Sequence, residues 1–255
     1  TLSLQRYASK LLGAQSSRLK LRLAFLAPRW FEAVSLTRES ADLTWCLPQG
    51  LAMVSMREMP THTQLKVGLE PFLLHSLAHI EFMALHTYWD TLARFELPNE
   101  CIKDLNLVAS QEAWHFKNLN ARLIKLGYKY GDFPVNSGLY DWSIKTQDSF
   151  LERIAITTLV NEARGLDSQQ RLVTKLISID PSKESAALVK KIVDEEVEHV
   201  RIGVKWFTEL CAPSDAESEF HTILNKHKIT LRPPFNDKAR QEASLPKSWY
   251  SQGTE

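Results

Sequence analysis

Residues 194–207 read DEEVEHVRIGVKWF, and residues 109–116 read ASQEAWHF. Each stretch holds one Glu-x-x-His pair within a longer run of helical periodicity: Glu112 with His115, and Glu196 with His199. Residues three apart on a helix share a face, so each pair can direct its two side chains to one place. The other residues on that face are apolar, which predicts that the glutamates are buried. Because an unpaired buried carboxylate is costly, these acids require a partner.

Apolar residues recur at helical spacing in four long stretches, and the sustained alternation that is typical of strands is absent. Pro71 suits a first helical turn, Gly127 is a typical helix stop, and a helix would end at Asp180-Pro181. About twenty residues separate the second stretch from the third, which is too many for a tight hairpin. The pattern predicts an all-α, ferritin-like four-helix bundle with one long crossover between its second and third helices. The predicted helices cover residues 71–95, 98–126, 149–178 and 183–211.

The remaining segments are expected to pack on this bundle within one structural domain. Residues 1–70 are predicted to form N-terminal helices and an extended arm over 37–70, residues 71–211 the bundle, and residues 212–255 a short helix and a tail. Residues 1–31 contain six basic residues and no acid. This bias favours a short basic helix pair, and an organellar targeting segment is the alternative.

The composition is that of an ordinary soluble globular protein. The chain has 255 residues, a formal charge of +1, 44% hydrophobic and 24% charged residues, which excludes global disorder and a disulfide scaffold. Near-neutral charge gives no whole-molecule attraction to nucleic acid or to an anionic membrane. No apolar run approaches the roughly 20 residues that cross a bilayer, so no membrane partner is expected. The cysteines form no CxxC pair and indicate reduced thiols in a cytoplasmic protein: Cys46, Cys101 and Cys211.

The other two predicted helices each carry one glutamate on an apolar face, Glu81 on the first and Glu162 on the third. One glutamate from each of two helices and one Glu-x-x-His from each of the other two form the ligand set of a dinuclear iron or manganese site. In the alternative, Arg or Lys side chains pair with four buried acids, and the histidines bond to backbone carbonyls. The predicted metal ligands are Glu81, Glu112, His115, Glu162, Glu196 and His199.

Three further histidines, His75, His79 and His86, lie on the first predicted helix, and a pair four residues apart can bind zinc. The HExxH pattern is absent because Ser76 stands where its glutamate would be. Packing or solvated histidines are therefore favoured, and a place for His79 beside the metal ligands is the alternative.

Charged residues close to the motifs have simpler interpretations. Glu195 and Glu198 are expected to point sideways into solvent. Arg164 and Asp167 either orient Glu162 through a salt bridge or form a plain surface pair. The chain contains no GxGxxG, GxxxxGK[ST] or GxSxG motif, so nucleotide binding through such loops and serine hydrolysis lack support.

Several motifs in the same order resemble the uncharacterised ferritin-like family called domain-of-unknown-function family 455. They are LLHSLAHIEFMAL (73–85), ASQEAWHFKNLNARLIKLGYKYGDFP (109–134), NEARGLD (161–167), DEEVEHVRIGVKWF (194–207) and PFNDKAR (234–240). The resemblance covers nearly the whole chain and implies a ferritin-like bundle with a dinuclear metal centre on the six ligands above. It implies no particular reaction.

These features lead to the expectation of a redox enzyme. Two Fe (or Mn) ions, bridged by Glu112 and Glu196, would activate O₂ to hydroxylate or desaturate a small-molecule or modified-nucleoside substrate, with electrons from an external donor. Ferritin-like hydroxylases, including the non-haem di-iron tRNA hydroxylase, are similar in kind. Ferroxidase activity, metal storage, peroxide detoxification and a non-enzymatic helical scaffold are the alternatives. A homodimer is compatible with the sequence.

Overall fold

The computed structural model describes residues 3–33 and 43–251, and the chain divides into two compact units, residues 1–144 and 145–255. The described residues are mostly helical, which confirms the all-α class. In the described part of the chain, no helix has the length and apolar character needed to cross a membrane. Residues 37–42 of the predicted arm and 252–255 of the predicted tail lie outside the described residues. The division into arm, bundle and tail stays a prediction.

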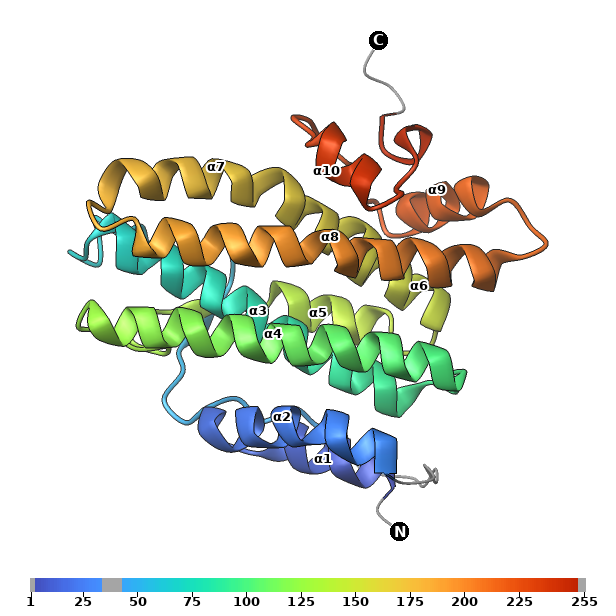
Figure 1. Ribbon diagram of the computed structural model, residues 1–255, viewed down its shortest axis with the longest axis horizontal. Coiled ribbons are helices and arrows are strands. Elements are labelled where there is room, and N and C mark those ends of the chain that lie inside the picture. Colours follow the sequence, from blue (N-terminus) through green and yellow to red (C-terminus); the bar gives the residue numbers. More distant parts are fainter. Residues whose placement is uncertain (1–2, 34–42, 252–255) are drawn as a thin grey trace. The chain divides into compact units, whose positions relative to one another are not determined.

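The first unit is built on the antiparallel helices α3 (Leu69–Arg94) and α4 (Asn99–Lys125), which lie side by side (Figure 1). Both start and end within two residues of the predicted bounds. Gly127, two residues beyond α4, has a φ of 87°, the left-handed conformation that commonly stops a helix. The centre of α3 is buried on almost every side, and Phe82 and Trp89 have no exposed surface. A helix that is buried all round belongs at the core of its unit.

The predicted N-terminal helix pair is confirmed as α1 (Leu4–Gly13) and α2 (Ser17–Ala33). α1 packs on α3, where the rings of Tyr7 and Trp89 lie 5.5 Å apart, and α2 packs on α4. The buried amine of Lys20 donates hydrogen bonds to the carbonyl oxygens of Leu11 and Leu12, at 2.9 and 2.7 Å. These carbonyls belong to the last turn of α1. Carbonyl oxygens at a helix C-terminus have no N–H donors within the helix. Burial lowers the pKa of Lys20 to about 8.

Residues 43–68 of the predicted arm are mostly irregular, as expected, with one short strand. β1 (Met53–Val54) pairs in parallel with β2 (Val135–Asn136), which lies in the segment between α4 and the second unit. That segment also contains α5 (Gly138–Lys145), so the connection of about twenty residues after α4 is partly helical. The ring of Trp45 lies 5.1 Å from that of Tyr140, and this contact attaches the arm to α5.

The second unit contains one long helical run of three consecutive segments and its antiparallel neighbour. The run consists of α6 (Phe150–Ile154), the π-helix η1 (Ala155–Glu162) and α7 (Ala163–Ile179), and the neighbour is α8 (Glu184–Cys211). Asp180 forms the turn between them, since its carboxylate accepts hydrogen bonds from the backbone N–H groups of Ser182 and Ser185 at 2.9 and 3.0 Å. α8 approaches η1 closely at Gly203, where an added Cβ would lie 2.5 Å from Thr158 Cβ. Only glycine allows this approach.

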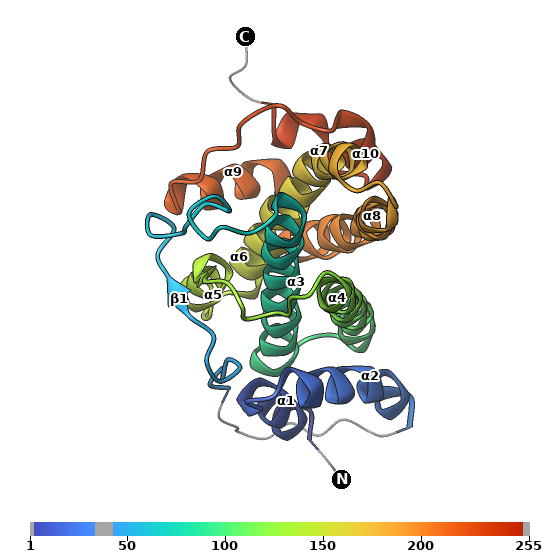
Figure 2. The ribbon, with the colours of Figure 1, turned by 90° about the vertical axis from the view of Figure 1, so that its left-hand side faces the viewer.

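The segment after α8 is more ordered than the predicted short helix and tail. It forms α9 (Ala216–Lys226), α10 (Asp237–Glu242) and the short 3₁₀-helix η2 (Lys247–Trp249), and α10 lies against α7 and α8 (Figure 2). The ring of Trp249 lies 5.6 Å from Phe207 and 5.4 Å from Phe220. Burial of these aromatic side chains fixes the C-terminal segment on the helices of its unit.

Candidate metal centre

The first unit brings together three of the predicted ligands. Glu81 projects from α3, and Glu112 and His115 project from the adjacent face of α4. One donor atom of each lies within 4.8 Å of the others, and His115 Nδ1 is 3.1 Å from Glu81 Oε2. The three side chains are at most 2% exposed. We call these residues the first triad.

The second unit assembles the same residue types. Glu162 is the last residue of the π-helix η1, and Glu196 and His199 lie one turn apart on α8. Their donor atoms again lie within 4.8 Å of one another, and His199 Nδ1 is 2.9 Å from Glu196 Oε2. Glu196 and His199 are buried, whereas Glu162 is half-buried. We call these residues the second triad.

The π-helix matters for the second triad because it sets where Glu162 lies. A π-helix has more residues per turn than an α-helix, and such segments occur frequently at functional sites. Eight residues of η1, from Ala155 to Glu162, adopt this wider helix and end at the predicted ligand. The apolar periodicity predicted a continuous α-helix here and carried no signal for the change.

The donor atoms of each triad are of the kinds that bind metal ions. Two carboxylates and one imidazole are donors that iron and manganese accept readily, and the donors of each triad are already gathered near one point. In both triads a histidine Nδ1 atom faces a glutamate oxygen. The residues present therefore fit a metal ion.

The histidines of α3 outside the triad have packing roles. His79 uses both ring nitrogens, Nδ1 at 2.9 Å from Tyr130 Oη and Nε2 at 2.7 Å from Asn136 O. Because a carbonyl oxygen can only accept, Nε2 carries the proton and Nδ1 accepts from the tyrosine hydroxyl. His75 Nε2 accepts a hydrogen bond from Gly131 N–H at 2.9 Å. Both histidines thus attach the segment after α4 to α3.

His75 should make stability depend on pH. Burial, with a smaller contribution from His79 and against the opposing charge of Asp132, lowers its pKa to about 4, from an ordinary value of 6.5. Between these pH values the unfolded chain binds the proton and the folded chain does not, so stability falls as pH falls from 6.5 towards 4. From pH 7 to pH 4.5, wild type should lose about 2 kcal/mol more unfolding free energy than His75→Gln, measured by urea titration.

The half-buried His62 supplies the matched control for this experiment. His62 precedes α3 and lies outside the cluster that holds Gly131. His62→Gln removes a histidine without touching that cluster, and it separates the effect of His75 from that of losing any imidazole. Equal pH dependence in His75→Gln and wild type would contradict the assignment.

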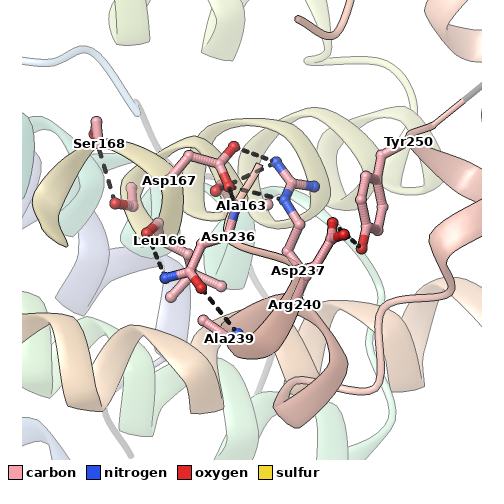
Figure 3. A network of polar contacts seen from close by, with 10 residues as sticks. Ala163, Leu166, Asp167, Ser168, Asn236, Asp237, Ala239, Arg240 and Tyr250 are labelled. Atoms are coloured by element: carbon pink, nitrogen blue, oxygen red, sulfur yellow. Dashed lines mark hydrogen bonds and ion pairs between the residues drawn. The ribbon is translucent and has the colours of Figure 1, made fainter. Parts of the chain in front are cut away.

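Asp167 has a different partner from the one the sequence suggested. Its carboxylate accepts hydrogen bonds from Arg240 Nη2 and Nε at 2.6 and 3.0 Å, and from Asn236 N–H at 2.8 Å (Figure 3). Both predicted roles, orientation of Glu162 together with Arg164 and a plain surface pair, are therefore replaced by a largely buried ion pair. The motifs NEARGLD (161–167) and PFNDKAR (234–240) meet here.

Glu195 and Glu198 lie beside the second triad, and both point away from it as expected. Glu195 Oε1 is 3.8 Å from Lys191 Nζ, and Glu198 pairs with Arg201 one turn further along α8. The Glu198 side chain is 43% exposed. It therefore serves as a control position for the ligands on the same helix.

Comparison with known proteins gives a family and a relative but no activity. The family model described as "Protein of unknown function (DUF455)" matches residues 14–251. A protein of Haemophilus influenzae with the name "Uncharacterized protein" is 32% identical over 211 residues, which cover 78% of this chain and 72% of that protein. No solved structure matches the chain.

Proposed function

This chain belongs to the DUF455 family of proteins of unknown function, and we propose that it is a ferritin-like oxidoreductase with a dinuclear iron (or Mn/Fe) centre. The observation that carries the proposal is the pair of triads, each with one lone glutamate and one Glu-x-x-His pair whose donor atoms lie within 4.8 Å of one another. Two such sets are what a dinuclear centre in a helical bundle needs. The side chains of the two triads would hold the ions: Glu81, Glu112, His115, Glu162, Glu196 and His199.

Charge balance supports two divalent ions. The two triads together contain four glutamates and two histidines, and five of these six side chains are buried. Four carboxylates would neutralise the charge of two divalent ions, with both histidines neutral. Buried charges are tolerated when they are paired or coordinate metals, so the same ligand set is costly without ions and favourable with them.

The protein's own residues would prepare the site in three ways. The glutamates hold the negative charge that retains the metal ions, and each histidine directs its Nδ1 atom towards the carboxylates. The first triad is buried, with its three side chains at most 2% exposed, so bulk water would be excluded from it. When bound, the metal pair would supply the electrons for O₂ activation, with an external donor to restore them. The substrate is then an unknown small molecule or modified nucleoside.

The experiment that tests the proposal is elemental analysis of protein purified without a metal-chelating column. Wild type should contain about two Fe or Mn ions per chain, either as isolated or after anaerobic addition of Fe(II). The double variant Glu112→Ala/His115→Ala should contain none, while its helical circular dichroism remains. Absence of metal from wild type after Fe(II) addition would overturn the proposal and favour a helical scaffold.

Ferroxidase activity with metal storage is the second candidate function, on the same ligands. Storage requires a cage of many subunits, so gel filtration separates the two candidates. Elution as a monomer or dimer supports the oxidoreductase, and elution as a large particle supports storage.

A further inference from the structure

The second unit contains a hollow of about 460 Å³ between the start of α7, the segment after α9 and α10. Its lining is rich in positive charge. Four cationic side chains face one carboxylate, that of Asp167: Arg164, Lys228, Arg232 and Arg240. The hollow lies within one unit and involves neither triad.

Arg240 forms the rigid floor of the hollow. It is 1% exposed, and its guanidinium carbon lies 4.9 Å from the centre of the Phe235 ring and 4.4 Å from that of Tyr250. Its Nε and Nη2 atoms donate to Asp167, as Figure 3 shows. Its buried Nη1 atom has no hydrogen-bond partner among the described residues. A buried donor without an acceptor is costly, and an arginine fixed between two rings is well prepared to bind an anion.

Among the described residues that line the hollow, no acid remains to pair with Arg164, Lys228 and Arg232. The carboxylate of Asp167 is occupied by Arg240, and no second acid lines the hollow. Partial burial and the positive charge of Arg240 both lower the pKa of Arg164. The lining side chains therefore repel one another, and an anion with more than one negative charge would relieve that repulsion.

We propose that this hollow binds the phosphate group of a small phosphomonoester. Phosphate matches the observations better than carboxylate because it carries up to two charges and offers three oxygens to planar guanidinium groups, which bind it through paired hydrogen bonds. The volume lies within the range of small-ligand pockets. The half-buried ring of Phe235 provides an apolar wall for the organic part of the ligand.

The test is isothermal titration of the full chain with phenyl phosphate, and with sodium benzoate as the carboxylate of similar shape, in chloride buffer of fixed ionic strength. Phenyl phosphate should bind at least 10-fold more tightly than benzoate. Arg164→Gln and Arg232→Gln should each weaken phenyl phosphate binding about 10-fold, because each removes a charged hydrogen-bond donor to the phosphate group. Arg171→Gln, an exposed cation on α7 outside the hollow, should change the affinity less than twofold.

Three results would overturn the proposal: equal affinity for benzoate, equal weakening by Arg171→Gln, or no binding of phenyl phosphate by wild type. A phosphate group could also bind a metal ion at the triads. The Glu112→Ala/His115→Ala variant separates the two sites, because binding in the hollow should persist there. Loss of binding in that variant would overturn the assignment to the hollow. Failure of the metal proposal leaves these expectations unchanged.

Discussion

Glu112→Ala and Glu196→Ala should each reduce the metal content of the protein from about two ions per chain to none. Each glutamate belongs to one triad and would supply negative charge and donor oxygens to the proposed centre. Loss of either glutamate would remove those donors and leave the positive charge of the ions poorly neutralised. Metal content is measured by elemental analysis after anaerobic Fe(II) loading and gel filtration, and helical content by circular dichroism.

Glu198→Ala is the control for this result, because Glu198 lies on α8 between the two ligands and pairs with Arg201 at the surface. It should keep about two ions per chain. Loss of only one ion in each of the two ligand variants would indicate two independent mononuclear sites. Full metal content in both would show that the assigned ligands are wrong.

Arg240→Met should reduce the free energy of unfolding by about 3–5 kcal/mol, the usual cost of removing one partner of a buried ion pair. The Arg240 and Asp167 side chains are only 1% and 9% exposed, and they are joined by two hydrogen bonds. Methionine keeps the aliphatic part of the arginine side chain but not the guanidinium group that lies over the rings of Phe235 and Tyr250. The variant therefore leaves the Asp167 carboxylate in place without its counter-charge. Urea unfolding at pH 7 measures the difference.

Two further variants test that explanation. Asp167→Leu/Arg240→Met removes both charges and should recover at least half of the lost stability, because an apolar pair often replaces a buried ion pair without cost. Lys238→Met, an exposed cation on the same short helix, should change stability by less than about 0.5 kcal/mol. If the double variant were as unstable as Arg240→Met, packing rather than charge would explain the loss.

Much of the helical framework could be predicted from the sequence because its helices are long and strongly periodic. The bounds of α3, α4 and α8 follow from apolar spacing and from local signals such as Gly127 and Asp180, which act within a few residues. The grouping of Glu112 with His115, and of Glu196 with His199, follows from helical geometry alone. The proximity of Glu81 to the first pair needed the packing of α3 on α4, which apolar faces predict only in outline.

The remaining features depend on contacts between distant residues. The π-helix η1 contacts Gly203 of α8 at Thr158. The apolar spacing within residues 155–162 does not predict this close contact between the two helices. The ordered C-terminal segment depends on rings that lie far apart in the sequence, including Phe207 and Trp249. Likewise, Asp167 forms its ion pair with Arg240, 73 residues further along the chain, whereas the nearer Arg164 was the expected partner. Sequence spacing carries little information about such pairs.

The buried amine of Lys20 has a consequence for the motions of the N-terminal helices. Its pKa of about 8, against 10.5 for an ordinary lysine, means that keeping it charged inside the hairpin of α1 and α2 costs about 3 kcal/mol at neutral pH. Separation of the two helices would release that cost, because the ammonium group would return to water. Above pH 8 the enclosed amine is neutral, and opening would then require uptake of a proton from solution. Local unfolding of this hairpin is thus linked to protonation. The free energy needed to separate α1 from α2 is higher under mildly alkaline conditions than at neutral pH.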